Sequence, residues 1–114
     1  MIIRDFLKTL NYLSENLIIK NIDLSDYGSY KGGYEDFYIG SNYNNNSKIT
    51  VKEIKEFFNE KVIGKTFWDY KGGDFLINEY ITLKFGCQEE VDNVDGLIID
   101  EDGIKIKVQK VLYY

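Results

Sequence analysis

The clearest secondary-structure signal in this chain lies in residues 50–64, TVKEIKEFFNEKVIG. Thr50, followed three residues later by Glu53, forms a capping box, which is a characteristic start of an α-helix. Gly64 suits the position just after the last turn, where a left-handed residue ends many helices. The apolar residues between them recur at helical spacing and are Val51, Ile54, Phe57, Phe58 and Val62. The stretch therefore predicts a helix with one apolar face for a core.

The segments on either side of this helix predict one further helix and several strands. Residues 3–14 have apolar side chains at helical spacing. Residues 23–33 and 40–47 are polar and read as loops. Gly103 supplies the positive φ that a tight hairpin at residues 100–103 needs, so that Ile104, Ile106 and Val108 face the core. The predicted strands are 17–22, 34–39, 75–77, 81–85, 97–99 and 104–112.

The order of these elements predicts the fold class. A helix, two strands, a second helix and a run of strands are best buried as an α+β fold. We expect a mostly antiparallel sheet of four to six strands, with both helices packed on one face. At 114 residues and 44% hydrophobic content, the chain suits a single domain over residues 1–114.

The composition argues against an enzyme. The chain has no histidine, which is the usual general base near neutral pH and the commonest metal ligand. We therefore expect no catalytic residues, no metal and no cofactor. Its single cysteine, Cys87, predicts a half-buried side chain and a reducing compartment. No apolar run approaches the roughly 20 residues that span a bilayer, so we expect a cytoplasmic protein without membrane contact.

Acidic residues gather near the C-terminus. The formal net charge of the chain is −5, and residues 86–104 contain seven acids without lysine or arginine. This charge argues against direct nucleic-acid binding, which needs basic residues. It favours an acidic face that docks on a basic protein surface, although a solvated loop and hairpin tip is the plainer interpretation. The candidate residues are Glu89, Glu90, Asp92, Asp95, Asp100, Glu101 and Asp102.

The tetrapeptide Tyr-Lys-Gly-Gly occurs twice, at residues 30–33 and 70–73. Paired glycines expose backbone amides, while lysine and tyrosine offer a charge and a stacking face, so two such loops suit a nucleotide. Alternatively, both are structural loops that enter strands. The candidate ligand residues are Tyr30, Lys31, Tyr34, Asp36, Tyr70, Lys71 and Asp74.

The sequence around these loops resembles a family of small, uncharacterised proteins from phages and bacterial mobile elements. Residues 29–37, SYKGGYEDF, are similar to its pattern S-Y-R-G-x-Y-x-D-L. Residues 64–73, GKTFWDYKGG, are similar to its pattern G-K-T-F-x-G-Y-K-G-G. Lys31 stands where the family has arginine, Phe37 where it has leucine, and Asp69 where it has glycine. The resemblance implies a phage or mobile-element source but no particular activity.

Two functional hypotheses follow. The first is a non-enzymatic phage-type protein that binds and inhibits a bacterial host protein in the host cytoplasm. Its target would be a defence component, such as a CRISPR effector or another protein that binds nucleic acid. The second is a protein that binds a nucleotide or signalling nucleotide through the Tyr-Lys-Gly-Gly loops, with a homo-oligomer interface as one location for the ligand. An enzyme that works with paired carboxylates is a weaker third.

Overall fold

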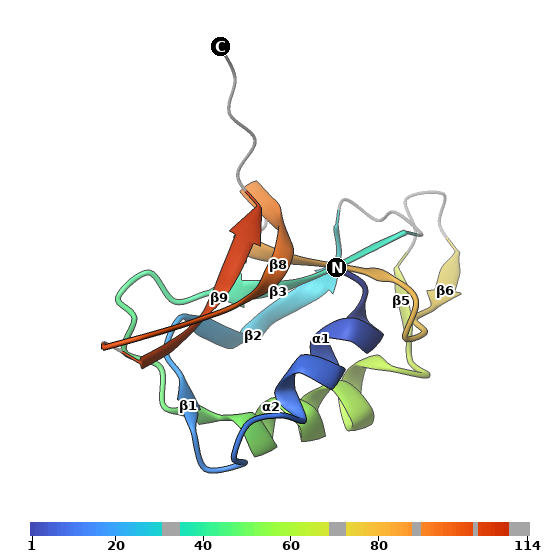
Figure 1. The fold of residues 1–114 in the computed structure, drawn as a ribbon. Helices are drawn as coiled ribbons and strands as arrows, with labels where there is room; N and C mark the ends of the chain where they lie inside the picture. The colour runs from blue at the N-terminus through green and yellow to red at the C-terminus, as the bar shows by residue number, and fades with distance from the viewer. Residues whose placement is uncertain (31–34, 69–72, 88–89, 102, 110–114) are drawn as a thin grey trace.

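A computed structural model describes residues 1–30, 35–68, 73–87, 90–101 and 103–109. Within these residues the chain forms two short α-helices and nine strands (Figure 1). In chain order they are α1 (Ile3–Leu10), β1 (Ile18–Ile19), β2 (Ile22–Ser29), β3 (Asp36–Ser41), β4 (Ile49–Thr50), α2 (Val51–Phe57), β5 (Thr66–Trp68), β6 (Asp74–Leu76), β7 (Thr82–Cys87), β8 (Glu90–Asp100) and β9 (Gly103–Gln109). A π-helical turn, η2 (Phe58–Val62), continues α2.

Most of the described strands belong to one mixed sheet. It has seven strands in the order β2-β3-β7-β8-β9-β1-β4, and β5 pairs with β6 in a separate two-stranded sheet. Within the larger sheet β3–β7 and β1–β9 are parallel pairs, and the other neighbours are antiparallel. The α+β class is therefore confirmed, but the expected count of four to six strands is too low. The short strand β4 was missed because two residues carry no periodicity.

A corner at Lys20 and Asn21 links two distant parts of the sheet. β1 precedes the corner and pairs with β9, whereas β2 follows it and pairs with β3. The side-chain carboxamide of Asn21 donates to the Ile106 carbonyl oxygen at 3.1 Å and accepts from the Ile106 amide at 2.8 Å. Because this pair of bonds imitates one rung of a strand ladder, Asn21 ties the start of β2 to β9 although the two strands are not paired.

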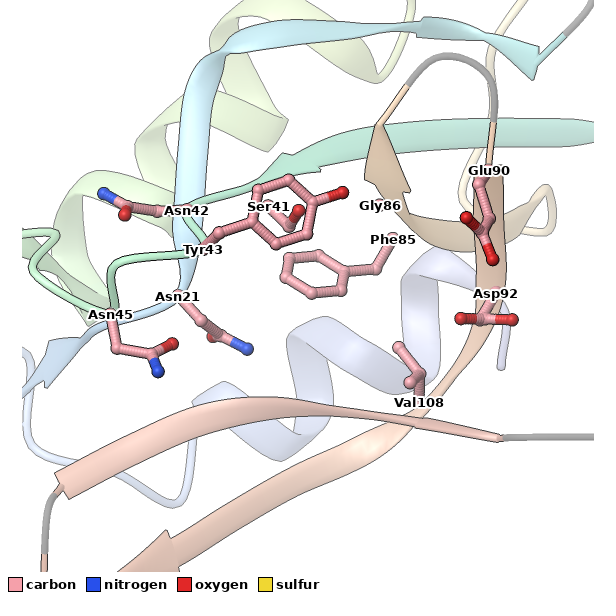
Figure 2. A pocket seen from close by; sticks show the side chains of 10 residues that line it. All are labelled: Asn21, Ser41, Asn42, Tyr43, Asn45, Phe85, Gly86, Glu90, Asp92 and Val108. Carbon is pink, nitrogen blue, oxygen red and sulfur yellow. The ribbon is translucent and has the colours of Figure 1, made fainter.

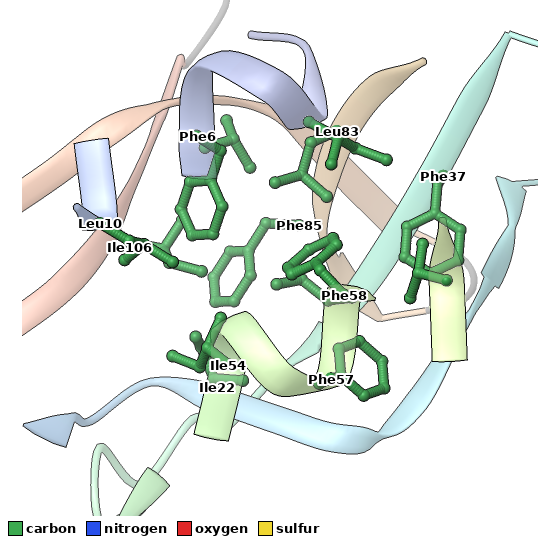
Figure 3. Close-up of a cluster of buried hydrophobic side chains, with 14 of the residues drawn as sticks. Phe6, Leu10, Ile22, Phe37, Ile54, Phe57, Phe58, Leu83, Phe85 and Ile106 are labelled. Carbon is green, nitrogen blue, oxygen red and sulfur yellow. The ribbon is translucent and has the colours of Figure 1, made fainter. Parts of the chain in front are cut away.

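The helices cover one side of this sheet and share its core (Figure 1). The capping box of α2 is confirmed: Thr50 Oγ1 accepts from the Glu53 amide at 3.2 Å. Phe58 is fully buried, with its ring centroid 5.9 Å from that of Phe6 and 6.3 Å from that of Phe37 (Figure 3). Buried aromatic contacts of this kind fix how the helices sit on the sheet.

The first helix is shorter than predicted. The sequence predicted a helix over residues 3–14, but α1 ends at Leu10, where the Asn11 amide donates to carbonyl oxygens of the last turn. None of the described helices is long and apolar enough to cross a membrane.

The predicted loop over residues 23–33 is wrong for residues 23–29, because β2 extends to Ser29, and residues 31–33 lie outside the described residues. Its polar sequence hid a strand with an irregular register against β3 between Asp23 and Tyr27. The Tyr27 ring packs edge-on against Phe57, with centroids 4.8 Å apart, and thereby anchors the strand to α2. This contact between distant residues stabilises a strand that local propensity does not predict.

The acidic stretch is also a strand. We expected a loop before residues 97–99, but β8 begins at Glu90 and pairs first with β7 and then with β9. Val94 is buried, which explains why the segment is held in the sheet despite its charges. The hairpin at residues 100–103 is confirmed: Asp100 pairs with Gly103, and Gly103 has a positive φ of +119°.

Candidate functional site

A cavity of about 470 Å³ opens beside the Asn21 corner (Figure 2). This volume lies within the range typical of small-ligand pockets. β7, β8 and β9 supply part of the lining, and the end of β3 with the loop that follows it supplies most of the rest. The lining residues are Asn21, Ser41, Asn42, Tyr43, Asn45, Phe85, Gly86, Glu90, Asp92 and Val108.

Two carboxylates form one wall of this pocket. Glu90 and Asp92 are two residues apart on β8, and alternate residues of a strand project to the same face. Figure 2 shows both side chains on one side of the pocket, opposite Asn42 and Asn45. Both acids are exposed, and within the described residues neither has a salt bridge. The pocket therefore carries two negative charges, and none of the described residues that line it is a lysine or an arginine.

The opposite wall is a loop held by its own hydrogen bonds. The Asn42 amide donates to the Asn21 carbonyl oxygen at 2.8 Å, which fixes the loop to the corner. Asn42 Nδ2 donates to Asn46 Oδ1 at 2.9 Å, and Asn42 Oδ1 accepts from the Asn44 amide at 3.1 Å. Asn45 adopts a positive φ of 51°, which asparagine tolerates better than most residues. These contacts form the wall without help from a ligand.

An unpaired hydroxyl lies in the pocket lining. Ser41 Oγ is buried and has no hydrogen-bond partner among the described residues. A buried polar atom without a partner costs free energy, so such atoms are uncommon in folded proteins. Phe85 forms an apolar part of the lining, with its ring placed between the two polar walls in Figure 2.

The structure divides the predicted acidic face into separate parts. Glu90 and Asp92 line the pocket, whereas Asp100 and Glu101 lie at the hairpin tip at the other end of β8. Asp95 lies between these groups and forms a salt bridge with Lys107 on β9 at 3.6 Å. Glu89 and Asp102 lie outside the described residues. Because β9 places lysines beside β8, the charge is less one-sided than the sequence suggested.

The two Tyr-Lys-Gly-Gly segments leave neighbouring points of the fold. Ser29 precedes the first segment, and its hydroxyl donates to the carbonyl oxygen of Trp68, which lies just before the second, at 2.8 Å. Of the candidate ligand residues, Tyr30, Asp36 and Asp74 are described, and Asp74 pairs with Trp68 across the β5–β6 hairpin. Lys31, Tyr34, Tyr70 and Lys71 lie outside the described residues. None of the three described residues lines the pocket beside Asn21.

Most of the pocket was not predicted from the sequence. Ser41 and Tyr43 were not singled out, because residues 40–47 read as an ordinary polar loop, and Asn21 was not singled out, because it lies in the predicted strand 17–22. The run Asn44-Asn45-Asn46 was the only local hint that this loop has a defined shape. The positions of these side chains relative to Glu90 and Asp92 depend on the sheet, which brings residues as distant in sequence as 21 and 108 to the same pocket.

Comparison with known proteins gives no relative: no family model, curated protein or solved structure matches this chain. The resemblance to phage and mobile-element proteins therefore stays a prediction. Within the described part of the chain, no group of three or more histidine, cysteine or acidic side chains could hold a metal ion.

Proposed function

We propose that this chain is a non-enzymatic protein that binds a basic surface of a bacterial host protein and inhibits it. The target is a defence component that binds nucleic acid, and the two proteins meet in the cytoplasm of the host cell. The phage or mobile-element source rests on the sequence resemblance, and the mode of binding rests on the acidic pocket.

This proposal rests on the exposure of the two acids that line the pocket and on their lack of a salt bridge among the described residues. Glu90 and Asp92 are exposed and lack a salt bridge among the described residues, whereas Asp95 on the same strand is paired with Lys107. Unpaired acids at a preformed pocket are placed to meet basic groups of another molecule. Effector proteins that bind nucleic acid carry such basic groups, because they neutralise phosphates. An acidic surface competes for them and accelerates the encounter.

The experiment compares two double variants with the same change of charge. Glu90→Gln with Asp92→Asn removes two charges at the pocket, and Asp100→Asn with Glu101→Gln removes two at the hairpin tip. Binding to defence effectors is measured by surface plasmon resonance at low and physiological salt. We expect the pocket variant to bind about tenfold more weakly and the tip variant to change by less than about threefold.

Two results would contradict this proposal. Equal weakening of both variants would show general electrostatic steering without a defined site. Full binding and full inhibition by the pocket variant would show that Glu90 and Asp92 do not take part in the contact with the target.

A second candidate function is favoured by the hydrogen bond between Ser29 and Trp68. This bond joins Ser29, which directly precedes the first Tyr-Lys-Gly-Gly segment, to Trp68, which lies two residues before the second, and this proximity supports a nucleotide that contacts both segments. Calorimetry with a panel of nucleotides and signalling nucleotides tests this function. Binding that is lost on Lys31→Ala with Lys71→Ala, at an unchanged melting temperature, would support it over the protein-binding proposal.

A further inference from the structure

The pocket lining contains two groups that only accept hydrogen bonds, together with the side chains of Ser41, Tyr43 and Asn45, which can both donate and accept. The carboxylates of Glu90 and Asp92 accept only, and Ser41 Oγ has no partner among the described residues. By contrast, the carboxamide of Asn21 is already engaged with Ile106 through both its oxygen and its nitrogen. The pocket therefore suits a ligand with several donors and a positive charge.

A guanidinium group matches this arrangement better than an ammonium group. It carries five N–H donors in a rigid plane, so it can meet acceptors on more than one wall, and it forms paired bonds with carboxylates. It is more weakly hydrated than an ammonium, and its flat face stacks on aromatic rings. The pocket offers two such rings, Tyr43 and Phe85 (Figure 2). Tyr43 is 74% exposed, so its ring is free to close over a bound group.

We propose that the pocket receives the side chain of an arginine from the bound partner. Its guanidinium lies against the β8 carboxylates, and Tyr43 or Phe85 covers its face. Rotation of the Ser41 side chain brings its Oγ, which is buried in the free protein, to the guanidinium. This inference rests on the proposed function, because it names the group that a basic target inserts at the acidic strand. After this rotation the Ser41 hydroxyl, which has no partner among the described residues, gains a donor.

The test uses a small probe, so it does not require the target. Isotope-labelled protein is titrated with N-acetyl-arginine N-methylamide, and backbone amide shifts are followed by NMR. We expect saturable shifts confined to the pocket, including Ser41, Tyr43 and Gly86. The matched lysine compound should bind at least about fivefold more weakly, because its ammonium lacks the planar fork. Absence of saturable shifts, or equal binding of both compounds, would overturn the inference.

Three variants connect the binding to the named groups. Glu90→Gln with Asp92→Asn should weaken the arginine compound about tenfold, whereas Asp100→Asn with Glu101→Gln should leave it within about twofold. Ser41→Ala should weaken it about threefold without lowering the melting temperature of the free protein, because it removes an unpaired buried hydroxyl. An equal effect of the two double variants, or unchanged binding by all three, would refute the assignment.

Two further comparisons complete the test. The first distinguishes an arginine inserted by a protein from a free small molecule as the ligand. The second distinguishes a failure of the pocket chemistry from a failure of the proposed function. Free arginine should bind no more tightly than the blocked compound, and a strong preference for free arginine would indicate a small-molecule site instead. If the arginine compound binds but no effector does, the proposed function fails while the pocket chemistry stands. If an effector binds with full dependence on Glu90 and Asp92 while the arginine compound does not bind, only the inference fails.

Discussion

The role of Asn21 as the link between β2 and β9 can be measured by its removal. Asn21→Ala deletes both hydrogen bonds to the Ile106 backbone, whose lengths are 2.8 and 3.1 Å. Each such bond contributes about 0.5–1.5 kcal/mol net, and an unpaired buried backbone group costs about 1–3 kcal/mol. Since Asn21 is only half-buried beside a pocket, water can reach part of the exposed backbone. We therefore expect a loss of about 2 kcal/mol in the free energy of unfolding.

The assay is urea denaturation at neutral pH, followed by far-ultraviolet circular dichroism. The midpoint should fall while the slope stays constant, because the surface exposed on unfolding is nearly unchanged. For a chain of this size the melting temperature should drop by about 8 °C. Asn21→Asp nearly keeps the shape but replaces the donor with a second oxygen facing the Ile106 carbonyl, so it should lose at least as much as one hydrogen bond.

The matched control is Asn46→Ala. Asn46 is exposed, and its side-chain oxygen accepts one bond from Asn42 at 2.9 Å, so its loss should change stability by no more than about 0.5 kcal/mol. If Asn21→Ala is as mild as Asn46→Ala, the carboxamide does not hold the corner, and strand pairing alone keeps β2 and β9 in place. If Asn21→Asp is as stable as the unaltered protein, the donated bond contributes nothing.

Two further predictions concern the space around a backbone glycine and the pH dependence of stability. Gly86 has a φ of +151°, and a Cβ there would overlap the Glu90 carbonyl oxygen, so Gly86→Ala should lose about 3 kcal/mol or more in urea denaturation. Gly64→Ala, at a φ of +81° in open space, should lose only about 1–2 kcal/mol, and equal losses would contradict the overlap. Burial, helped by the hydrogen bond to Asp26, raises the pKa of Tyr38 from 10.0 to about 12. Between these values the folded protein keeps a proton that the unfolded chain has lost, so stability should fall as pH rises from 10 to 12. Urea midpoints should decline less steeply in Tyr38→Phe, and an identical decline would contradict this cause.

Local chemistry explains what the sequence determined. The capping box of Thr50 and Glu53 is formed within four residues, so it could be recognised without knowledge of the fold. The hairpin before Gly103 is equally local, and the alternation that follows it correctly predicted that Ile104 and Ile106 are buried. The two helices, the hairpin and the α+β class all follow from signals of this kind.

The tertiary structure decided the parts that depend on distant partners. β2 looked like a loop because the contact of Tyr27 with Phe57 and the pairing with β3 are invisible to local periodicity. The acidic stretch looked like a solvated segment because its buried Val94 and its neighbours on β7 and β9 come from elsewhere in the chain.

The candidate site shows the same division. The sequence correctly indicated that acids are concentrated between residues 86 and 104, since charge is a property of composition. It did not indicate that Asp95 is paired with Lys107 while Glu90 and Asp92 face a pocket. Electrostatic energy depends on distances of a few ångströms between charges, and only the pairing of β8 with β7 and β9 sets those distances.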